Sequence, residues 1–320
     1  MIIVTGAAGF IGSKLVERLN LEGFNDIVIV DDFSREDKRG NYEGLKFTLK
    51  VERESFAEWI TENENQVQFI FHLGARTDTT KTDVELFNKL NLEYTKEVWN
   101  LCVKYGLALV YASSAATYGD GTFGYSDSHE VVGDLKPLNP YGESKNDFDK
   151  WALAQDRKPY FWVGLKFFNV FGPNEGHKNR MASVVLHTFR QVSSTGKMNL
   201  FRSHNPDFND GEQTRDFVFV DDVTKVCFYM MKHRLKTPSG LYNLGSGKGR
   251  TYLELVNATF KSMGLEPHIE FVDTPEDIRD TYQYFTEADL SKLREAGYNE
   301  EFTSLEDGIE NYISSLIASS

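Results

Sequence analysis

Residues 2–12 read IIVTGAAGFIG, an unbroken apolar run followed by glycines at positions 6, 9 and 12. Such a run is typical of a strand that is buried on both faces of a parallel sheet. Leu15, Val16 and Leu19 then follow at helical spacing, and Gly23 is a suitable helix end. In a strand–turn–helix unit, glycines let the backbone approach a pyrophosphate, which the helix N-terminus attracts. The stretch therefore predicts a dinucleotide-binding fold at the start of the chain.

The second expected strand, Ile27–Val30, ends at Asp31 and Asp32. Asp31 lies about 20 residues beyond the turn, where an acidic group reaches the adenosine ribose of a dinucleotide. A carboxylate there repels a 2′-phosphate and so favours NAD. Basic residues that could instead hold that phosphate follow nearby: Arg35, Lys38, Arg39 and Arg53. On these residues alone, the choice between NAD and NADP stays open.

Two further strands are expected at 68–72 and 107–111, with a helical stretch near 85–105 between them. This alternation favours an α/β fold with a Rossmann-type, doubly wound parallel sheet. His72 ends one of these strands and is expected to be a packed histidine rather than a catalytic one. The backbone that follows it, Leu73–Ala75, could line the cofactor.

No linker or repeat divides the chain. We expect residues 1–170 and about 214–244 to form the dinucleotide-binding domain, with residues 217–220 returning the chain to it. Segments at about 171–213 and 245–320 would build a smaller, interlocked α/β substrate domain. The active site would then lie in the cleft between the two.

Composition and charge argue against several kinds of protein. The 320 residues are 40% hydrophobic, which supports a packed core, and the net charge of −13 disfavours nucleic acids and anionic membranes as partners. No apolar run approaches the roughly 20 residues that span a bilayer, and the start runs into a strand instead of a signal peptide. Cys102 and Cys227 lie in apolar helical stretches, so buried thiols are expected rather than a disulfide or a metal site. These features predict a cytoplasmic protein without a metal.

Tyr141 and Lys145 lie four residues apart and would share one face of a helix. A nearby ammonium favours the phenolate and moves the pKa of the phenol toward the working range. Such a pair can take a proton from an alcohol while a cofactor takes the hydride. The pair therefore indicates a redox enzyme that acts on a carbinol.

The glycine turn, the stretch YASSAATYG at 111–119 with Ser114, and the Tyr141–Lys145 pair together resemble the extended short-chain dehydrogenase/reductase superfamily. The stretch FFNVFGP at 167–173 resembles its nucleotide-sugar epimerases. The resemblance implies that Tyr141 is the catalytic acid/base and that Ser114 orients the reacting hydroxyl. It also implies that Lys145 tunes the phenol and holds the nicotinamide ribose.

Three stretches narrow the resemblance to the ADP-L-glycero-D-manno-heptose 6-epimerase family: GHKNRMASV at 176–184, SSAATY at 113–118 and FTEADL at 285–290. Membership would imply inversion of C6″ in an ADP-heptose for lipopolysaccharide-core synthesis. It would also imply tightly held NADP, reduced and reoxidised in each turnover, and a homo-oligomer, pentameric in that family. The resemblance assigns Lys178 as a second acid/base beside Tyr141. A contact between Lys178 and the diphosphate is the alternative.

The remaining site residues are assigned by matching position. Those expected at the cofactor are Gly6, Gly9, Phe10, Ile11, Gly12, Asp31, Asp32, Lys38, Arg53, Leu73, Gly74, Ala75, Asn91, Lys145, Val170 and Lys178. Those expected at the sugar nucleotide are Ser114, Asn169, Arg180, His187, Phe201, Arg202, Ser203, His204, Arg215 and Tyr282. Arg215 could clamp the diphosphate or pair with Asp216, and Arg180 receives no definite role. The loop 201–214 is longer and more polar than is typical of the family.

Three other functions share part of this pattern. A nucleotide-sugar 4,6-dehydratase needs a carboxylic acid near Ser114, where this chain has Ala115, Ala116 and Thr117. A UDP-sugar 4-epimerase would share the chemistry of Tyr141 but not the segment around Lys178. A non-catalytic nucleotide sensor would not need Ser114, Tyr141 and Lys145 together.

Overall fold

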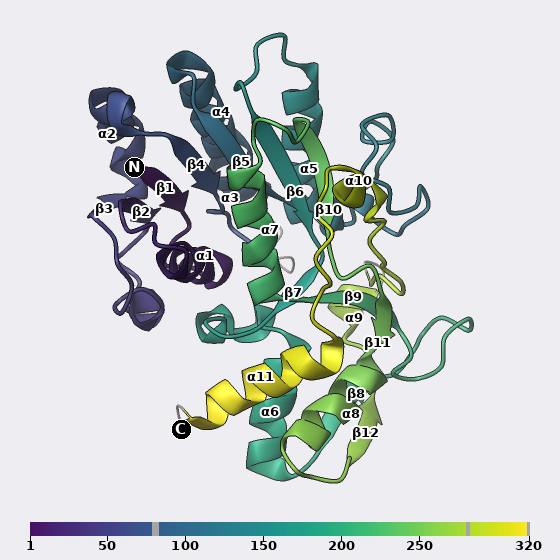
Figure 1. Ribbon diagram of the computed structural model, residues 1–320. Coiled ribbons are helices and arrows are strands. Elements are labelled where there is room, and N and C mark those ends of the chain that lie inside the picture. Colours follow the sequence, from purple (N-terminus) through teal and green to yellow (C-terminus); the bar gives the residue numbers. More distant parts are fainter. Residues whose placement is uncertain (79–82, 280–281, 319–320) are drawn as a thin grey trace.

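Seven parallel strands form the large sheet of the computed structural model, which describes residues 1–78, 83–279 and 282–318 (Figure 1). Their order across the sheet is β10-β6-β5-β4-β1-β2-β3. The bounds in chain order are β1 (Ile2–Thr5), β2 (Ile27–Asp31), β3 (Leu49–Glu52), β4 (Phe69–His72), β5 (Ala108–Ser114), β6 (Trp162–Phe167) and β10 (Gly240–Leu244). The strands expected near 2–4, 27–30, 68–72 and 107–111 are thereby confirmed, as is the doubly wound parallel sheet.

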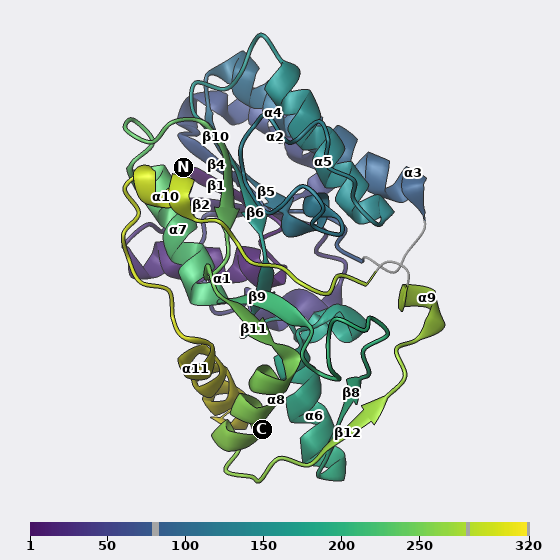
Figure 2. The same ribbon diagram turned by 90° about the vertical axis from the view of Figure 1, so that its right-hand side faces the viewer.

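Both faces of this sheet are covered by helices (Figure 2). On one face, α1 (Phe10–Leu21) packs against α7 (Val220–Lys232), and on the other lie α2 (Phe56–Asn63), α4 (Tyr94–Tyr105) and α5 (Pro140–Ala154). Successive residues of β1 point to opposite faces, so Ile2 and Val4 join the core under α1 while Ile3 joins the core under α4. The continuous apolar run of β1 follows from burial on both sides.

The helical stretch expected near 85–105 is divided into three parts. The short α3 (Val84–Phe87) leads into a π-helical segment, Asn88–Glu93, and then into α4. A π-helical turn holds one more residue than an α-helical turn and often occurs at functional sites. Here it carries Asn91, one of the expected cofactor residues.

The smaller part of the molecule lies below the large sheet in Figure 1 and has two short sheets. One has the order β11-β9-β7 and the other pairs β12 with β8. The strands are β7 (Asn169–Phe171), β8 (Met198–Phe201), β9 (Thr214–Phe219), β11 (Gly249–Thr251) and β12 (Ile269–Val272). The helices there are α6 (Val184–Thr195), α8 (Tyr252–Ser262), α9 (Glu276–Arg279) and α11 (Leu305–Ala318).

Two segments lie elsewhere than the sequence suggested. Strand β9 covers much of 217–220, but it pairs with β7 and β11, because the position beside β6 in the large sheet is taken by β10. Helix α10 (Ser291–Glu295) lies against β10, and its Leu293 joins the core under α1. In the division into two domains that we propose, β9 therefore goes with the smaller part and α10 with the larger.

Cys102 and Cys227 are free thiols, fully buried in the cores on opposite faces of the large sheet, as expected. Among the described residues, no helix combines the length and apolar character needed to cross a bilayer. Within the same residues, no group of three His, Cys, Asp or Glu side chains is placed to hold a metal ion.

Candidate active site

The glycine turn between β1 and α1 has no room for side chains. Gly6 has a φ of 70°, and a Cβ on it would lie 2.6 Å from the backbone nitrogen of Gly74. A Cβ on Gly12 would strike the carbonyl oxygen of Gly6. Gly9 is the N-cap of α1 and has no side chain that could accept a hydrogen bond. The first backbone amides of the helix, at Phe10 and Ile11, therefore have no side-chain cap. This arrangement fits a phosphate group at the helix N-terminus.

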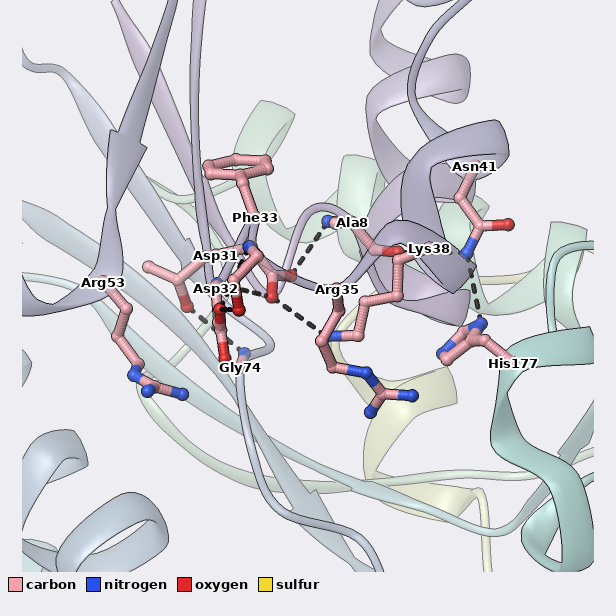
Figure 3. Close-up of polar contacts among 12 residues, drawn as sticks. Ala8, Asp31, Asp32, Phe33, Arg35, Lys38, Asn41, Arg53, Gly74 and His177 are labelled. Carbon is pink, nitrogen blue, oxygen red and sulfur yellow. Dashed lines mark hydrogen bonds and ion pairs between the residues drawn. The ribbon is translucent and has the colours of Figure 1, made fainter.

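Asp31 joins the glycine turn to the basic residues that follow β2 (Figure 3). Its Oδ2 accepts a hydrogen bond from the Ala8 backbone at 2.9 Å. Its Oδ1 accepts one from the Asp32 backbone at 2.8 Å and forms an ion pair with Lys38 Nζ at 3.0 Å. Lys38 thus neutralises the carboxylate that, by itself, would repel a 2′-phosphate.

Asp32 lies between Arg53 and Arg35 in Figure 3. The Ser34 hydroxyl donates to its carboxylate at 2.6 Å, and this bond, with smaller contributions from Arg53 and Lys38, lowers the pKa of Asp32. Arg53 pairs with the adjacent Glu54. The corner therefore places two acidic and several basic side chains at the end of β2.

The segment after β4 lies directly against the glycine turn. Gly74 donates its backbone hydrogen to Thr5 Oγ1 at 3.2 Å, and Leu73 donates to the Thr5 carbonyl at 3.2 Å. His72 is hydrogen-bonded to Thr5 Oγ1 at 2.8 Å and to Thr95 Oγ1 at 3.0 Å, and burial lowers its pKa to about 3. His72 is thus a neutral, packed histidine, as expected.

Asn91 is fully buried in the π-helical segment. Its Oδ1 accepts from the Arg76 backbone at 2.8 Å, and its Nδ2 donates to the Arg76 carbonyl and to Ser144 Oγ, both at 3.0 Å. The amide therefore fixes the segment that follows Ala75 to α5. An influence of Asn91 on a bound cofactor would pass through that segment.

Helix α5 carries both Tyr141 and Lys145, as expected, and presents them to the end of β5. Asn139 caps it by accepting from the Gly142 backbone at 2.9 Å. A Cβ on Gly142 would lie 2.8 Å from the Ala116 carbonyl oxygen, so only glycine permits this close approach. The Tyr141 side chain is hydrogen-bonded to Ser114, and Lys145 Nζ donates to the Ala112 carbonyl at 2.8 Å. Three of the four residues expected to carry out catalysis are thus brought to the end of β5, and Lys178 is the fourth.

The ionisation of this pair differs from the expectation. Burial raises the pKa of Tyr141, and the hydrogen bond from Ser114 only partly opposes this rise. The expected lowering by Lys145 is not found, because burial outweighs other influences on the phenol and the ammonium faces Ala112. Burial also lowers the pKa of Lys145 to about 8, while Asp149 acts to raise it.

Lys178 lies on a short 3₁₀ segment, Gly176–Met181, which is interrupted at Asn179 with a φ of 49°. Its Nζ lies 5.4 Å from the ring centroid of Phe10, the first residue of α1. Burial lowers the pKa of Lys178, as a second base would need, and Glu175 opposes this.

Side-chain amides hold this segment over the glycine turn. Asn41 Nδ2 lies 3.0 Å from the Ala8 carbonyl oxygen, 3.2 Å from the Asn174 carbonyl oxygen and 3.2 Å from His177 Nδ1 (Figure 3). Asn174 in turn donates to Ser13 Oγ on α1 at 3.0 Å. Lys178 is thereby held near the start of α1 by residues from three separate parts of the chain.

Glu175 is fully buried at the base of the same segment. Its carboxylate accepts from the Ser183 backbone at 2.6 Å and from Ser183 Oγ at 2.5 Å, and it is hydrogen-bonded to Tyr312 on α11. Ser183 also caps α6 by accepting from the Leu186 backbone. The Lys178 segment is therefore fixed to two helices of the smaller part.

Arg215 on β9 is only 5% exposed and lies between two aromatic rings. Its guanidinium carbon is 5.3 Å from the ring centroid of Tyr282 and 5.7 Å from that of Tyr252. It donates to the carbonyls of Thr214 and Gln283. Asp216 is not its partner, since the Asp216 carboxylate accepts from Ser246, Gly247 and Ala288.

Gln283 connects the surroundings of Arg215 to the turn that follows β5, because its side chain donates to the Gly119 carbonyl at 2.5 Å. Asn169, at the start of β7, is exposed, whereas Val170 packs against the cores of both parts. His187 Nε2 lies 3.2 Å from the carbonyl oxygen of Arg180. Asn169 and Arg215 thus come from β7 and β9 of the small sheet, and His187 comes from α6.

The expected residues 201–204 are held by the long polar loop itself. Arg202 forms ion pairs with Asp210 and Asp273, and the Ser203 backbone donates to Asp210. The His204 backbone donates to Tyr284 OH at 3.3 Å, and the ring of Tyr284 lies against that of Tyr282. Tyr284 and Tyr282 thus connect residues 201–204 to Arg215. Phe201 is the last residue of β8, paired with Val272.

Sequence reasoning missed Tyr252, Asn41, Glu175 and the buried residues Asp149 and Lys166. Asp149 had a signal that could have been used, since it continues the four-residue spacing of Tyr141 and Lys145 along α5. The other residues act through contacts between distant segments, which spacing along the chain does not indicate.

Comparison with known proteins agrees with this geometry. The model of the NAD dependent epimerase/dehydratase family matches residues 2–245. The ADP-L-glycero-D-manno-heptose-6-epimerase of Fusobacterium nucleatum is 44% identical over 328 residues, covering 99% of this chain and 98% of the relative.

Two solved structures are similar along nearly their whole length. The Helicobacter pylori ADP-L-glycero-D-manno-heptose-6-epimerase has a TM-score of 0.81 and 28% identity, covering 99% of this chain and 96% of that one. The Thermus thermophilus UDP-glucose 4-epimerase in complex with NAD has a TM-score of 0.80 and 25% identity, covering 100% and 99%. On this evidence, the chain belongs to the NAD dependent epimerase/dehydratase family.

Proposed function

We propose that this protein is an ADP-glycero-manno-heptose 6-epimerase, which interconverts the D-glycero and L-glycero forms of its substrate by transient oxidation at C6″. The observation that carries the proposal is the 44% identity to the F. nucleatum enzyme over nearly the full length of both chains. The Tyr141–Lys145–Ser114 group and the half-buried Lys178 supply the chemistry that such a reaction requires. Its product would serve lipopolysaccharide-core synthesis.

The residues at the end of β1 and β2 fit a nicotinamide dinucleotide. The glycine turn leaves no room for a Cβ, and the amides at the start of α1 lack a side-chain cap, which suits a diphosphate. When bound, the nicotinamide ring supplies a hydride acceptor and, after oxidation of the sugar, a hydride donor. Gly74 and the neighbouring Leu73 and Ala75 would lie along this group.

We infer that the preferred cofactor is NADP, with NAD as the alternative. Lys38 already neutralises Asp31, so the carboxylate no longer opposes a 2′-phosphate. Among the described residues, Arg53 pairs with its neighbour Glu54 alone and lies beside Asp32, where its guanidinium can bind a phosphate. Both basic residues are those that the sequence resemblance selected.

The proposed proton transfers use the chain's own residues. Ser114, hydrogen-bonded to Tyr141, orients the C6″ hydroxyl, and Tyr141 takes its proton as the hydride leaves. The resulting ketone has lost the stereocentre, and the sugar presents its other face for the return of the hydride. A proton must then reach the oxygen from a second position.

Lys178 is the proposed donor of that proton. Its burial and lowered pKa suit a group that exchanges a proton near neutrality, and its place beside Phe10 brings it near the glycine turn. The same location would let it contact a diphosphate, which is the alternative role. Arg215, between Tyr252 and Tyr282, is proposed to bind the diphosphate of the ADP-sugar.

Neither of the other enzyme classes gains a specific observation from the structure. In place of the acid that a 4,6-dehydratase requires, Thr117 follows Ser114, and its hydroxyl donates to the Ser114 carbonyl at 2.8 Å. The homo-oligomer and the cytoplasmic location stay predictions of the sequence. An ADP-sugar substrate is compatible with a homo-oligomer and with a cytoplasmic location.

The reaction is tested by incubating the protein with ADP-D-glycero-D-manno-heptose in D₂O and following C6″ by NMR. The expected result is conversion to the L-glycero form without deuterium at C6″, because the hydride leaves and returns without exchanging with solvent. An unchanged configuration would contradict the proposal. Deuterium at C6″ would show that a proton is abstracted from this carbon and exchanged with solvent, which would contradict transient oxidation.

The cofactor is tested by mass spectrometry of the nucleotide released from the purified protein. NADP is expected from the unaltered protein, and a lower ratio of NADP to NAD is expected for Lys38→Met combined with Arg53→Leu. Lys197→Met is the matched control, since Lys197 lies between α6 and β8 in the smaller part and pairs with Glu270. NAD from the unaltered protein would contradict the inference.

A further inference from the structure

A pair of opposite charges lies fully buried behind the Tyr141–Lys145 helix. Asp149 on α5 and Lys166 on β6 are both 0% exposed, with 2.8 Å between Oδ2 and Nζ. Such a pair, removed from water, is weak evidence for stability, because the loss of hydration offsets much of the attraction. A contribution to stability therefore does not explain the presence of this buried ion pair.

The Asp149 end of the pair acts on Lys145. Tyr141, Lys145 and Asp149 follow one another at four-residue spacing, so they lie along one face of α5. Asp149 favours the charged form of Lys145 and thereby opposes the effect of burial. Hydroxyls of β5 fix the carboxylate, since Tyr111 OH donates to it at 2.9 Å and Ser113 Oγ at 2.6 Å.

The Lys166 end of the pair acts on Ser114. Lys166 Nζ donates to Thr117 Oγ1 at 2.8 Å, and Thr117 Oγ1 donates to the Ser114 carbonyl at 2.8 Å. The same ammonium lies 5.1 Å from the ring centroid of Tyr118. Lys166 is therefore connected to the turn that begins at Ser114.

We propose that Asp149 and Lys166 form a positioning unit for the reaction: Asp149 keeps Lys145 in its charged form, and Lys166 balances Asp149 and fixes Ser114 through Thr117. Neither residue touches the reacting atoms. The inference rests on the proposed function only in assigning Ser114, Tyr141 and Lys145 to catalysis.

Four titratable groups that the described residues bring to this cluster are neutral near pH 7. Tyr141 shares its helix, and Tyr111 and Tyr118 come from β5 and the turn after it; burial raises the pKa of all three. His72, from β4, has a pKa lowered to about 3. Among the described residues, Asp149 and Lys166 thus supply the charges that the test can alter separately.

The test is an NMR titration of the holoenzyme labelled with ¹³Cε-lysine, with the Lys145 signal assigned by its loss in Lys145→Arg. Asp149→Asn removes the negative charge, so the titration midpoint of Lys145 should fall by about one pH unit or more. Lys166→Met leaves the negative charge without its partner and should raise the midpoint. The double variant should titrate near the unaltered protein.

Opposite shifts support the proposal, and shifts of the same sign, or none, overturn it. Asp147→Asn is the matched control, because it changes an exposed carboxylate two residues away on the same helix and should leave the midpoint unchanged. If Asp149→Asn does not fold, Lys166→Met decides by the sign of its shift alone.

This titration needs no substrate, so it is separate from the assay of function. A protein that titrates as expected but does not epimerise ADP-heptose contradicts the proposed function and leaves the positioning unit supported. In an active enzyme, Asp149→Asn should lower kcat increasingly as pH rises above 7, while Asp149→Glu recovers part of the loss. A uniform loss at every pH would indicate a structural role and overturn the proposal.

Discussion

Lys145 is buried and Lys178 is half-buried, and both have a lowered pKa and a nearby buried carboxylate, yet the chain holds them in different ways. Lys145 lies within a helix that is packed on the large sheet, and its Nζ is bonded to the Ala112 carbonyl. Lys178 lies on a short 3₁₀ segment, and side chains from other segments hold it in place. Secondary structure fixes the first lysine, and tertiary contacts fix the second.

This difference suits the two proposed roles. A lysine that supports Tyr141 in every turnover benefits from a rigid frame. A lysine that meets the sugar only after its other face is presented can tolerate a segment with some freedom. Variants that act on one lysine and not the other can test whether the two are distinct.

Tyr141→Phe should produce the largest effect, because it removes the proton acceptor on the rigid side. Epimerisation should fall about 10²–10⁴-fold, as for other general acid–base residues, while the cofactor stays bound. Chiral analysis of the ADP-heptose and mass spectrometry of released cofactor provide the measurements. Turnover equal to that of the unaltered protein would remove Tyr141 from the mechanism.

Lys178→Met should suppress the net conversion about 10²-fold or more if Lys178 transfers the second proton. If Lys178 only contacts the diphosphate, KM should rise while much of kcat survives. Steady-state kinetics separates the two outcomes. Lys197→Met, which alters a half-exposed lysine paired with Glu270, serves as the control and should change neither constant.

The pH dependence of kcat should follow the ionisation of Lys145. Because its pKa is lowered to about 8, the ammonium is lost as pH rises through that value, and kcat should decline there. The folded protein also releases this proton before the unfolded chain, whose lysine has a pKa of 10.5, so stability from this group should rise between about pH 8 and 10.5. A rate that stays level to pH 9.5 would contradict the need for a charged Lys145.

Ser183→Ala should have the smallest effect and should act only on the Lys178 side. It removes the cap of α6 and one of the donors to Glu175, at a cost of about 1 kcal/mol in the free energy of unfolding. Denaturant titration measures this cost, and the Lys145 midpoint should not move. A change in that midpoint would show that the two lysines are coupled.

The extent to which the sequence predicts this molecule follows the same division. Local patterns were sufficient for the β1–α1 unit, for the parallel strands β1, β2, β4 and β5, and for the position of Tyr141 and Lys145 on one helix, because these depend on neighbours in the chain; β3, β6 and β10 were missed. The π-helical turn at Asn91, the pairing of β9 and the surroundings of Arg215 depend on distant segments. The pKa of Tyr141 was misjudged because spacing places two side chains on one face without revealing how deeply they are buried.

Asn41 brings together Ala8 in the glycine turn, Asn174 and His177. The segment that carries Lys178 therefore covers the place where a dinucleotide would lie. A cofactor bound under this segment would leave only when these contacts break. Since one turnover both removes and restores the hydride, nothing requires it to leave. We therefore expect the cofactor to be reduced and reoxidised without exchange, so that the rate of epimerisation does not follow the ratio of oxidised to reduced nucleotide in the cell.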